Sequence, residues 1–153
     1  MIVRRGDARD DQGSEGRAAE LGAFECLRYS DAGKLTQFGA YLETLPPGSR
    51  SSVRHWHEQC DEMVYIVAGE ATVLEDDGEH LLQPGDAACW PAGVASAHHV
   101  VNRSAAPCSY LIVGARVKDD ICHYSDIGRV LHTEGENWRL VQSDGTVIKS
   151  GKV

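Results

Sequence analysis

The stretch His55-Trp56-His57-Glu58-Gln59-Cys60-Asp61-Glu62 lies just before a β-branched run at residues 64–67. In an extended strand, side chains two residues apart point to the same face, so His55 and His57 would aim at one point. Neutral imidazole is the commonest metal ligand among side chains, and the Glu62 carboxylate could complete a set around a divalent cation. The stretch therefore predicts a metal site between two β-strands. The alternative is that both histidines only line a polar interior.

The composition is that of one ordinary globular domain. The chain has 153 residues, of which 42% are hydrophobic and 25% charged, enough for a single core. No apolar run approaches the roughly 20 residues of a membrane helix, and residues 1–7 do not resemble a signal peptide. We therefore expect a cytoplasmic protein without membrane contact.

The net charge indicates which partners to expect, and the cysteine content indicates the redox state of the thiols. The formal net charge is −8, and the basic residues are scattered along the chain. Phosphate contacts need clustered Lys and Arg, so nucleic acid is not an expected partner. Five cysteines without a Cys-x-x-Cys pair indicate reduced thiols rather than a disulfide framework.

Short strand patterns separated by Gly and Pro turns occupy most of the chain after residue 23. The expected strands are 24–29, 37–45, 62–68, 70–74, 79–82, 87–90, 98–102 and 108–115. Asp77-Gly78 suits a tight hairpin, and Gln83-Pro84-Gly85-Asp86 is typical of a type II turn. Residues 5–20 are polar and are predicted to form a mobile or loosely docked arm. Residues 123–132 show little periodicity, whereas Ser143-Asp144-Gly145 predicts a C-terminal hairpin.

Two motifs in this order resemble those of the cupin superfamily. The first is Gly48-x6-His55-x-His57-x4-Glu62-x6-Gly69, and the second is Gly85-x5-Pro91-x-Gly93-x4-His98-x3-Asn102. The resemblance implies an all-β fold, the double-stranded β-helix or jelly-roll barrel. It divides the chain into a flexible N-terminal arm (1–22), a cupin β-barrel (23–117) and a C-terminal extension (118–153) packed on the barrel or on a partner subunit.

The same resemblance implies one divalent metal ion per chain. Its ligands would be His55, His57, Glu62 and His98, with the remaining coordination positions open to water or substrate. Three nitrogens and a carboxylate suit Fe, Mn, Ni, Cu, Co or Zn, and ligand type does not choose among them. The spacing departs from the commonest pattern before the last histidine, which leaves His98 and His99 as alternatives. Strand parity favours His98, and His99 is then expected to point outward.

Other residues are weaker candidates. His123 and Tyr124 could cap the barrel mouth and act as a general acid or base. Cys60 could be a redox-sensitive thiol, although a loop cysteine is more often a bystander. Trp56 and Trp90 are expected to be packing residues.

Cupins include enzymes and binding proteins, so three functions are considered. The preferred one is a metal-dependent oxygenase acting on a small organic molecule. The second is a Lewis-acid isomerase, lyase or cyclase like the cupin-type sugar-phosphate isomerases. No inward-facing Lys or Arg is apparent in the expected strands, which disfavours a phosphorylated substrate. The third is a non-catalytic binder of a small ligand or metal. A homodimer is expected, because pairing would cover exposed sheet edges.

Overall fold

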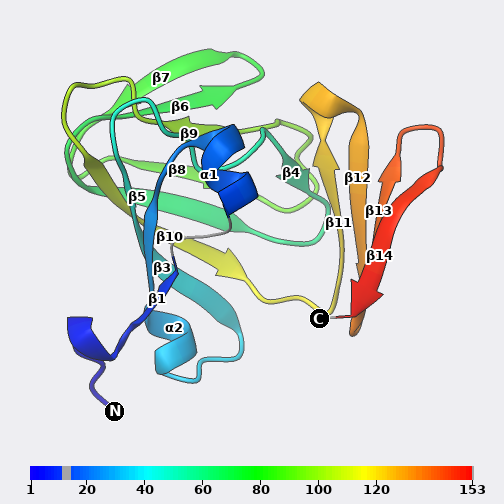
Figure 1. The fold of residues 1–153 in the computed structure, drawn as a ribbon, viewed down its shortest axis with the longest axis horizontal. Coiled ribbons are helices and arrows are strands. Elements are labelled where there is room, and N and C mark those ends of the chain that lie inside the picture. The colour runs from blue at the N-terminus through cyan, green and yellow to red at the C-terminus, as the bar shows by residue number, and fades with distance from the viewer. Residues whose placement is uncertain (12–14, 153) are drawn as a thin grey trace.

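The described residues form three antiparallel sheets (Figure 1). The computed structural model describes residues 1–11 and 15–152. The six-stranded sheet has the order β1 (Arg9–Asp11), β2 (Glu25–Arg28), β3 (Phe38–Leu45), β10 (Cys108–Ala115), β5 (Glu62–Ala68) and β8 (Ala87–Trp90). The five-stranded sheet has the order β14 (Val147–Lys152), β13 (Asn137–Gln142), β12 (Arg129–Glu134), β11 (Asp119–Tyr124) and β4 (Trp56–His57). The three-stranded sheet has the order β7 (Gly78–Leu82), β6 (Ala71–Glu75) and β9 (His99–Val101).

Helices are short among the described residues. They are the 3-10 helices η1 (Arg5–Asp7) and η2 (Ser125–Ile127) and the α-helices α1 (Glu15–Leu21) and α2 (Tyr29–Ala32). In the described part of the chain, no helix has the length and apolar character that a bilayer crossing requires. Antiparallel strands dominate the described residues, so the predicted all-β barrel is confirmed.

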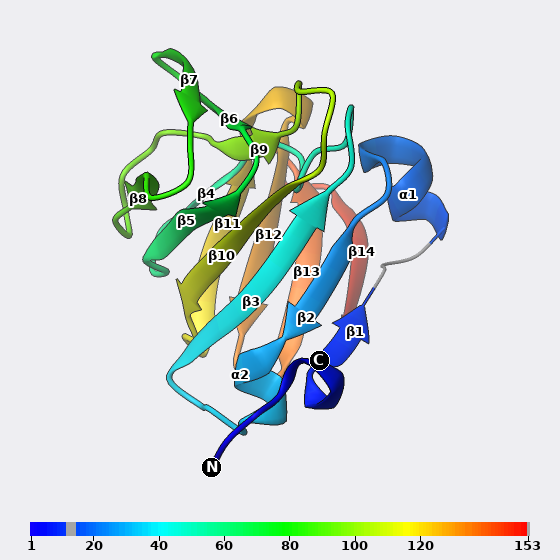
Figure 2. The same cartoon turned by 90° about the vertical axis from the view of Figure 1, so that its left-hand side faces the viewer.

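The core lies between the sheets, on the inward faces of their strands. Figure 2 shows β1, β2, β3 and β10 in front of β11 to β14, so the two larger sheets face one another. Strand alternation places Val64 and Ile66 of β5 and Tyr110 of β10 inside, each at most 1% exposed. The core thus continues across the barrel as one cluster and fixes the strands that carry the metal-site candidates.

Two glycines show why turns fall where they do. Gly85 has a φ of +102°, and the Asp86 amide donates to the Gln83 carbonyl at 2.9 Å, as a type II turn requires. Gly69 has a φ of +75°, and a Cβ there would lie 2.5 Å from the Pro107 carbonyl oxygen. Only glycine therefore lets β5 end beside the start of β10.

The structure differs from the sequence prediction at both ends of the chain. Residues 119–124 and 129–134 form the paired strands β11 and β12, although residues 123–132 show little periodicity. The C-terminal hairpin is confirmed as β13 and β14. β11 also pairs with β4, with Cys122 opposite His57. At the other end, β1 is hydrogen-bonded to β2, while residues 12–14 of the predicted arm lie outside the described residues. The division at residues 22 and 117 stays a prediction.

Candidate metal centre

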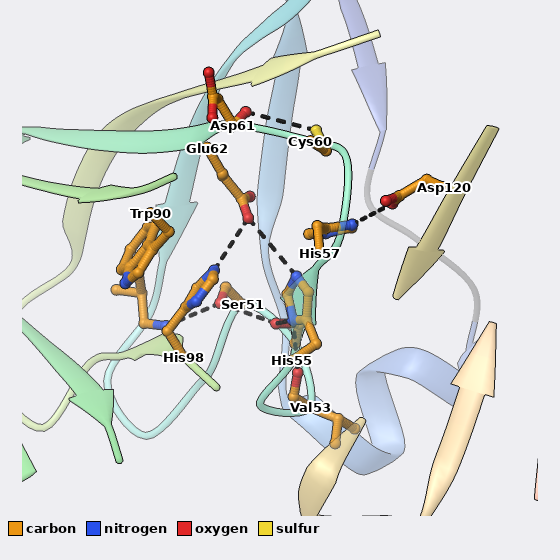
Figure 3. Close-up of polar contacts among 12 residues, drawn as sticks. Ser51, Val53, His55, His57, Cys60, Asp61, Glu62, Trp90, His98 and Asp120 are labelled. Carbon is orange, nitrogen blue, oxygen red and sulfur yellow. Dashed lines mark hydrogen bonds and ion pairs between the residues drawn. The ribbon is translucent and has the colours of Figure 1, made fainter. Parts of the chain in front are cut away.

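Three histidine side chains converge beside the barrel interior (Figure 3). His55 and His98 form an isolated antiparallel bridge, with backbone N–H···O distances of 3.1 and 2.9 Å. Residues directly opposite one another across an antiparallel pair share a face, so their rings meet, with centroids 5.2 Å apart. His57 follows on the same strand face, and its ring centroid lies 5.1 Å from that of His55.

Each of these rings places its Nδ1 atom against a hydrogen-bond acceptor. The pairs are His55 with the Val53 carbonyl at 2.9 Å, His98 with the Ser96 carbonyl at 3.1 Å, and His57 with the Asp120 carboxylate at 2.5 Å. Carbonyl and carboxylate oxygens can only accept, so the ring proton lies on Nδ1. Nε2 is then left with a free lone pair, which is the usual state of a metal-binding histidine.

Glu62 faces two of these Nε2 atoms from the start of β5. Its Oε2 atom lies 3.1 Å from Nε2 of His98 and 3.8 Å from Nε2 of His55. A neutral imidazole with its proton on Nδ1 offers only a lone pair to the carboxylate, and two acceptors repel at this distance. A cation between them, either a second proton or a metal ion, removes the conflict. The donor set therefore fits a divalent cation.

The protonation of two of these groups follows from their burial and neighbours. Burial lowers the pKa of His55, and this effect outweighs the opposing influence of the Glu62 carboxylate. Burial opposes ionisation of Glu62 as well, but the hydrogen bond that Nε2 of His98 donates when its ring carries a second proton, together with the nearby His55, outweighs burial and lowers the Glu62 pKa. A neutral imidazole and an ionised carboxylate are the forms that bind metal.

The four residues predicted as ligands lie together, but not as one compact set. Among the described residues, the ligand atoms of His55, Glu62 and His98 all lie within 4.8 Å of one another. His57 belongs to a second set, with His55 and Cys122, that meets the same limit. His55 is shared by both sets. Their role as ligands stays a prediction.

The two adjacent histidines 98 and 99 point to different surroundings. His98 is stacked on the Trp90 indole, with ring centroids 3.8 Å apart and an interplanar angle of 4°, and it contacts Glu62. His99 instead places Nδ1 2.9 Å from the Ser52 carbonyl. The expectation that His99 points outward is wrong, because its side chain is only 7% exposed. It lines the same cavity as His98 and Glu62, and the chain at Ser52 covers it.

The weaker candidates in the tail separate by strand parity. His123 lies opposite Trp56 in the β4–β11 pair, stacks on its ring at 4.1 Å, and places Nε2 2.8 Å from Glu58. It therefore lies on the face of β11 opposite to that of Cys122. The Tyr124 ring, on the same side as Cys122, lies 5.8 Å from that of His55. Tyr124 thus borders the candidate site and His123 does not.

Cys60 does not have the surroundings of a reactive thiol. Its Sγ atom lies 3.0 Å from the Ala115 carbonyl. Burial, followed by the nearby Glu62 carboxylate, raises its pKa to about 11, so little thiolate exists at neutral pH. A redox role for Cys60 is therefore not supported.

A cavity of about 170 Å³ adjoins the histidines and holds a second carboxylate. Its walls include Glu62, His55 and His98 on one side and Glu43 and Tyr110 on the other. The Tyr110 hydroxyl donates to Glu43 at 2.7 Å and is fully buried. The lining contains two glutamates and no Lys or Arg, as the sequence led us to expect.

Three residues near the site were missed at the sequence level. Asp120 and Cys122 reach it only because β11 pairs with β4, a contact between segments more than 60 residues apart. No local pattern indicates such a pairing. Glu43 lies within the expected strand 37–45, but nothing in the sequence indicates which face of that strand lines the cavity.

Comparison with known proteins identifies the family. The family model described as a cupin domain matches residues 41–114. A crystal structure of a sugar phosphate isomerase from a cupin superfamily, from Silicibacter pomeroyi, is 35% identical, with 97% of each chain covered and a TM-score of 0.90. The chain belongs to the cupin superfamily. The search of curated proteins gives no match to this cupin.

Other solved structures share the fold of this cupin at lower identity. A candidate sugar phosphate isomerase from Acidithiobacillus ferrooxidans is 26% identical, with 80% of this chain and 78% of that chain covered and a TM-score of 0.76. A polyketide cyclase from Streptomyces resistomycificus is 22% identical, with 76% and 80% covered and a TM-score of 0.60. At 22% identity the likeness shows the fold alone.

Proposed function

We propose that this cupin is a divalent-metal-dependent isomerase that acts on a small sugar phosphate or a related hydroxy-carbonyl compound. The observation that carries the metal site is the 3.1 Å contact between Nε2 of His98 and Oε2 of Glu62, with Nε2 of His55 3.8 Å from the same oxygen. The class of reaction is supported by the Silicibacter pomeroyi sugar phosphate isomerase, which is similar over nearly the whole chain.

His55, His57, Glu62 and His98 would hold the metal ion. When bound, a divalent cation polarises a substrate carbonyl and so acidifies the adjacent C–H bond. The protein's own contribution is rigid positioning: Val53, Ser96 and Asp120 orient the imidazoles, and the Trp90 indole holds the His98 ring in one plane. A site fixed in this way needs little rearrangement when substrate arrives.

Glu43 is the candidate base for the proton transfer. It lines the same cavity as the proposed ligands but lies on a different strand, and the Tyr110 hydroxyl fixes its carboxylate. Interconversion of an aldose and a ketose moves a proton between adjacent carbons, and a positioned carboxylate can accept it from one and return it to the other. The cavity of about 170 Å³ would receive the reacting end of the sugar.

A phosphate group would have to lie outside this acidic cavity. A neighbouring hollow of about 160 Å³ shares Glu62 and Ile112 with the cavity and is also lined by Arg116. The guanidinium of Arg116 already contacts Asp31, the Tyr41 hydroxyl and the Leu35 carbonyl. These contacts hold its planar group in place beside the route to Glu62, where it could hydrogen-bond a phosphate oxygen.

The test is substrate-dependent deuterium incorporation in D₂O, followed by NMR. The metal-loaded protein is incubated with a panel of aldose and ketose phosphates and their unphosphorylated counterparts. We expect exchange of a proton next to the carbonyl, and a Glu43→Gln variant should lose at least about 100-fold in rate while keeping its metal. No exchange with any panel member would refute the assignment as an isomerase. Full exchange by the Glu43→Gln variant would refute Glu43 as the base.

The metal-dependent oxygenase preferred from the sequence stays a prediction. Oxygen uptake by protein loaded with Fe, Mn, Ni or Cu, measured with small phenols, diketones and thiols, tests it directly. Uptake without proton exchange would favour the oxygenase over the isomerase.

A further inference from the structure

A thiol shares the site with the two histidines of the His-x-His motif. The ligand atoms of His55, His57 and Cys122 lie within 4.8 Å of one another. The Cys122 side chain is 3% exposed. It therefore lies against the imidazoles, sheltered from solvent.

The fold places this thiol by backbone pairing. Cys122 is directly opposite His57 in the antiparallel β4–β11 pair, so the two side chains leave the sheet on the same face. Asp120, two residues earlier on that face, contacts Nδ1 of His57 and leaves Nε2 available. Tyr124, two residues later, hydrogen-bonds Cys122. One strand therefore supplies a sulfur ligand, the group that orients a histidine, and a hydrogen-bond partner for the sulfur.

The other four cysteines lack this arrangement. Cys26 and Cys108 belong to the apolar core cluster, Cys89 is exposed, and Cys60 contacts the Ala115 carbonyl. Among the described residues, no other cysteine belongs to a cluster of three potential metal ligands. The chain therefore provides close control positions for a cysteine substitution.

We propose that Cys122 joins His55 and His57 as a thiolate ligand that gives the site a preference for borderline-soft cations such as Zn²⁺ and Co²⁺. Thiolate sulfur suits these ions, whereas the carboxylate of Glu62 suits Mn²⁺ and other hard ions. His55 belongs to both ligand sets, so a single ion bound to it could take its remaining ligands from either set. This inference rests on the metal site of the proposed function.

The binding step is a simple proton exchange without redox chemistry. As the sulfur donates an electron pair to the metal, the S–H bond breaks and its proton passes to the buffer. The Tyr124 hydroxyl, as a donor to the sulfur, stabilises the resulting thiolate. Burial raises the pKa of the free Cys122 thiol to about 12, so its proton would leave only when a metal ion binds the sulfur, and a softer ion should then release about one more proton per site than Mn²⁺ does.

The decisive experiment is a Co²⁺ titration of the full chain followed by near-ultraviolet absorbance. A thiolate bound to Co²⁺ gives an intense sulfur-to-metal charge-transfer band. We expect that band in the wild-type protein and in a Cys108→Ser control, and its loss in Cys122→Ser. Co²⁺ and Zn²⁺ affinities should fall at least about tenfold in Cys122→Ser, while Mn²⁺ affinity, measured by electron paramagnetic resonance, should be unchanged.

Each outcome separates the two proposals. Co²⁺ bound at one equivalent without a charge-transfer band would overturn the role of Cys122 and leave the proposed metal site standing. Failure of Co²⁺, Zn²⁺ and Mn²⁺ to bind would overturn both. If Cys122→Ser does not fold, the wild-type band and the proton release on Zn²⁺ binding still decide the question. A Tyr124→Phe variant should retain the band at a shifted wavelength.

Discussion

Asp120→Asn should weaken metal binding although it leaves every proposed ligand residue unchanged. Oδ1 of Asp120 accepts from the Gln59 amide at 3.0 Å, and Oδ2 lies 2.5 Å from Nδ1 of His57. An asparagine offers only one acceptor oxygen in place of two, so its NH₂ group must face either the Gln59 amide or Nδ1 of His57. With its carbonyl toward Gln59, its NH₂ would donate to Nδ1 of His57 and move the ring proton to Nε2. The proposed ligand atom would then be blocked.

The expected magnitude follows from this change of tautomer. Loss of the group that orients a metal-bound histidine costs about 10- to 100-fold in metal affinity, or roughly 1.4 to 2.7 kcal/mol. The Asp120 side chain is only 13% exposed, so water cannot readily replace the lost contact.

Isothermal titration with Mn²⁺ and Zn²⁺ measures the effect, and Asp119→Asn is the matched control. Asp119 is the preceding residue on the same strand, but its carboxylate accepts from the Gly135 amide and is exposed. We expect weaker binding by Asp120→Asn and unchanged binding by Asp119→Asn. Equal affinities for both variants and the wild type would refute the tautomer argument.

Three further predictions concern packing, pH and assembly. Trp90→Phe removes a 2.5 Å indole N–H bond to Glu75 and should lower the free energy of unfolding by about 1 kcal/mol or more in urea titrations. Asp126→Asn should lower the free energy of unfolding by at most about 1 kcal/mol at neutral pH. The hydrogen bond with Arg54 holds the Asp126 pKa below its ordinary value. The stabilisation by Asp126 therefore exists above about pH 4 and disappears as the pH falls further. Light scattering should give a dimer mass, and Tyr65→Glu, on the outer face of the six-stranded sheet, should shift it toward the monomer.

Each of these has a contradicting result. Unchanged stability of Trp90→Phe would mean that the indole bond contributes nothing measurable. A destabilisation by Asp126→Asn that persists at pH 2 would show that it does not arise from the ion pair. The dimer prediction uses the apolar row of Leu42, Leu111 and Tyr65 across the sheet, with Tyr65 43% exposed, and a monomer mass for the wild type would contradict it.

The sequence was most informative where function depends on local alternation. His55 and His57 share a face because they are two residues apart, and Glu62 follows at the start of the next strand. The turn residues of the two motifs also fixed most strand boundaries between residues 38 and 115. These features depend on neighbours in the chain, and the cupin resemblance added the link between the two motifs.

Features that depend on distant pairing could not be predicted in this way. Strand β11 is only partly buried and begins with two aspartates, so its period-two pattern is weak. Its pairing with β4 nevertheless brings Asp120 and Cys122 to the histidines. The burial of His99 could not be predicted for the same reason. Strand parity gives the direction of a side chain but not which distant segment covers it. In this case, Ser52 covers it.

The most direct test of the metal site compares His98→Ala with His99→Ala. The two residues are adjacent and nearly equally buried, but only His98 contacts Glu62. Metal stoichiometry is measured by elemental analysis after loading and dialysis. The proposed site predicts about one ion per chain for the wild type and His99→Ala, and far less for His98→Ala. Full occupancy in His98→Ala, or its loss in His99→Ala alone, would contradict the assignment.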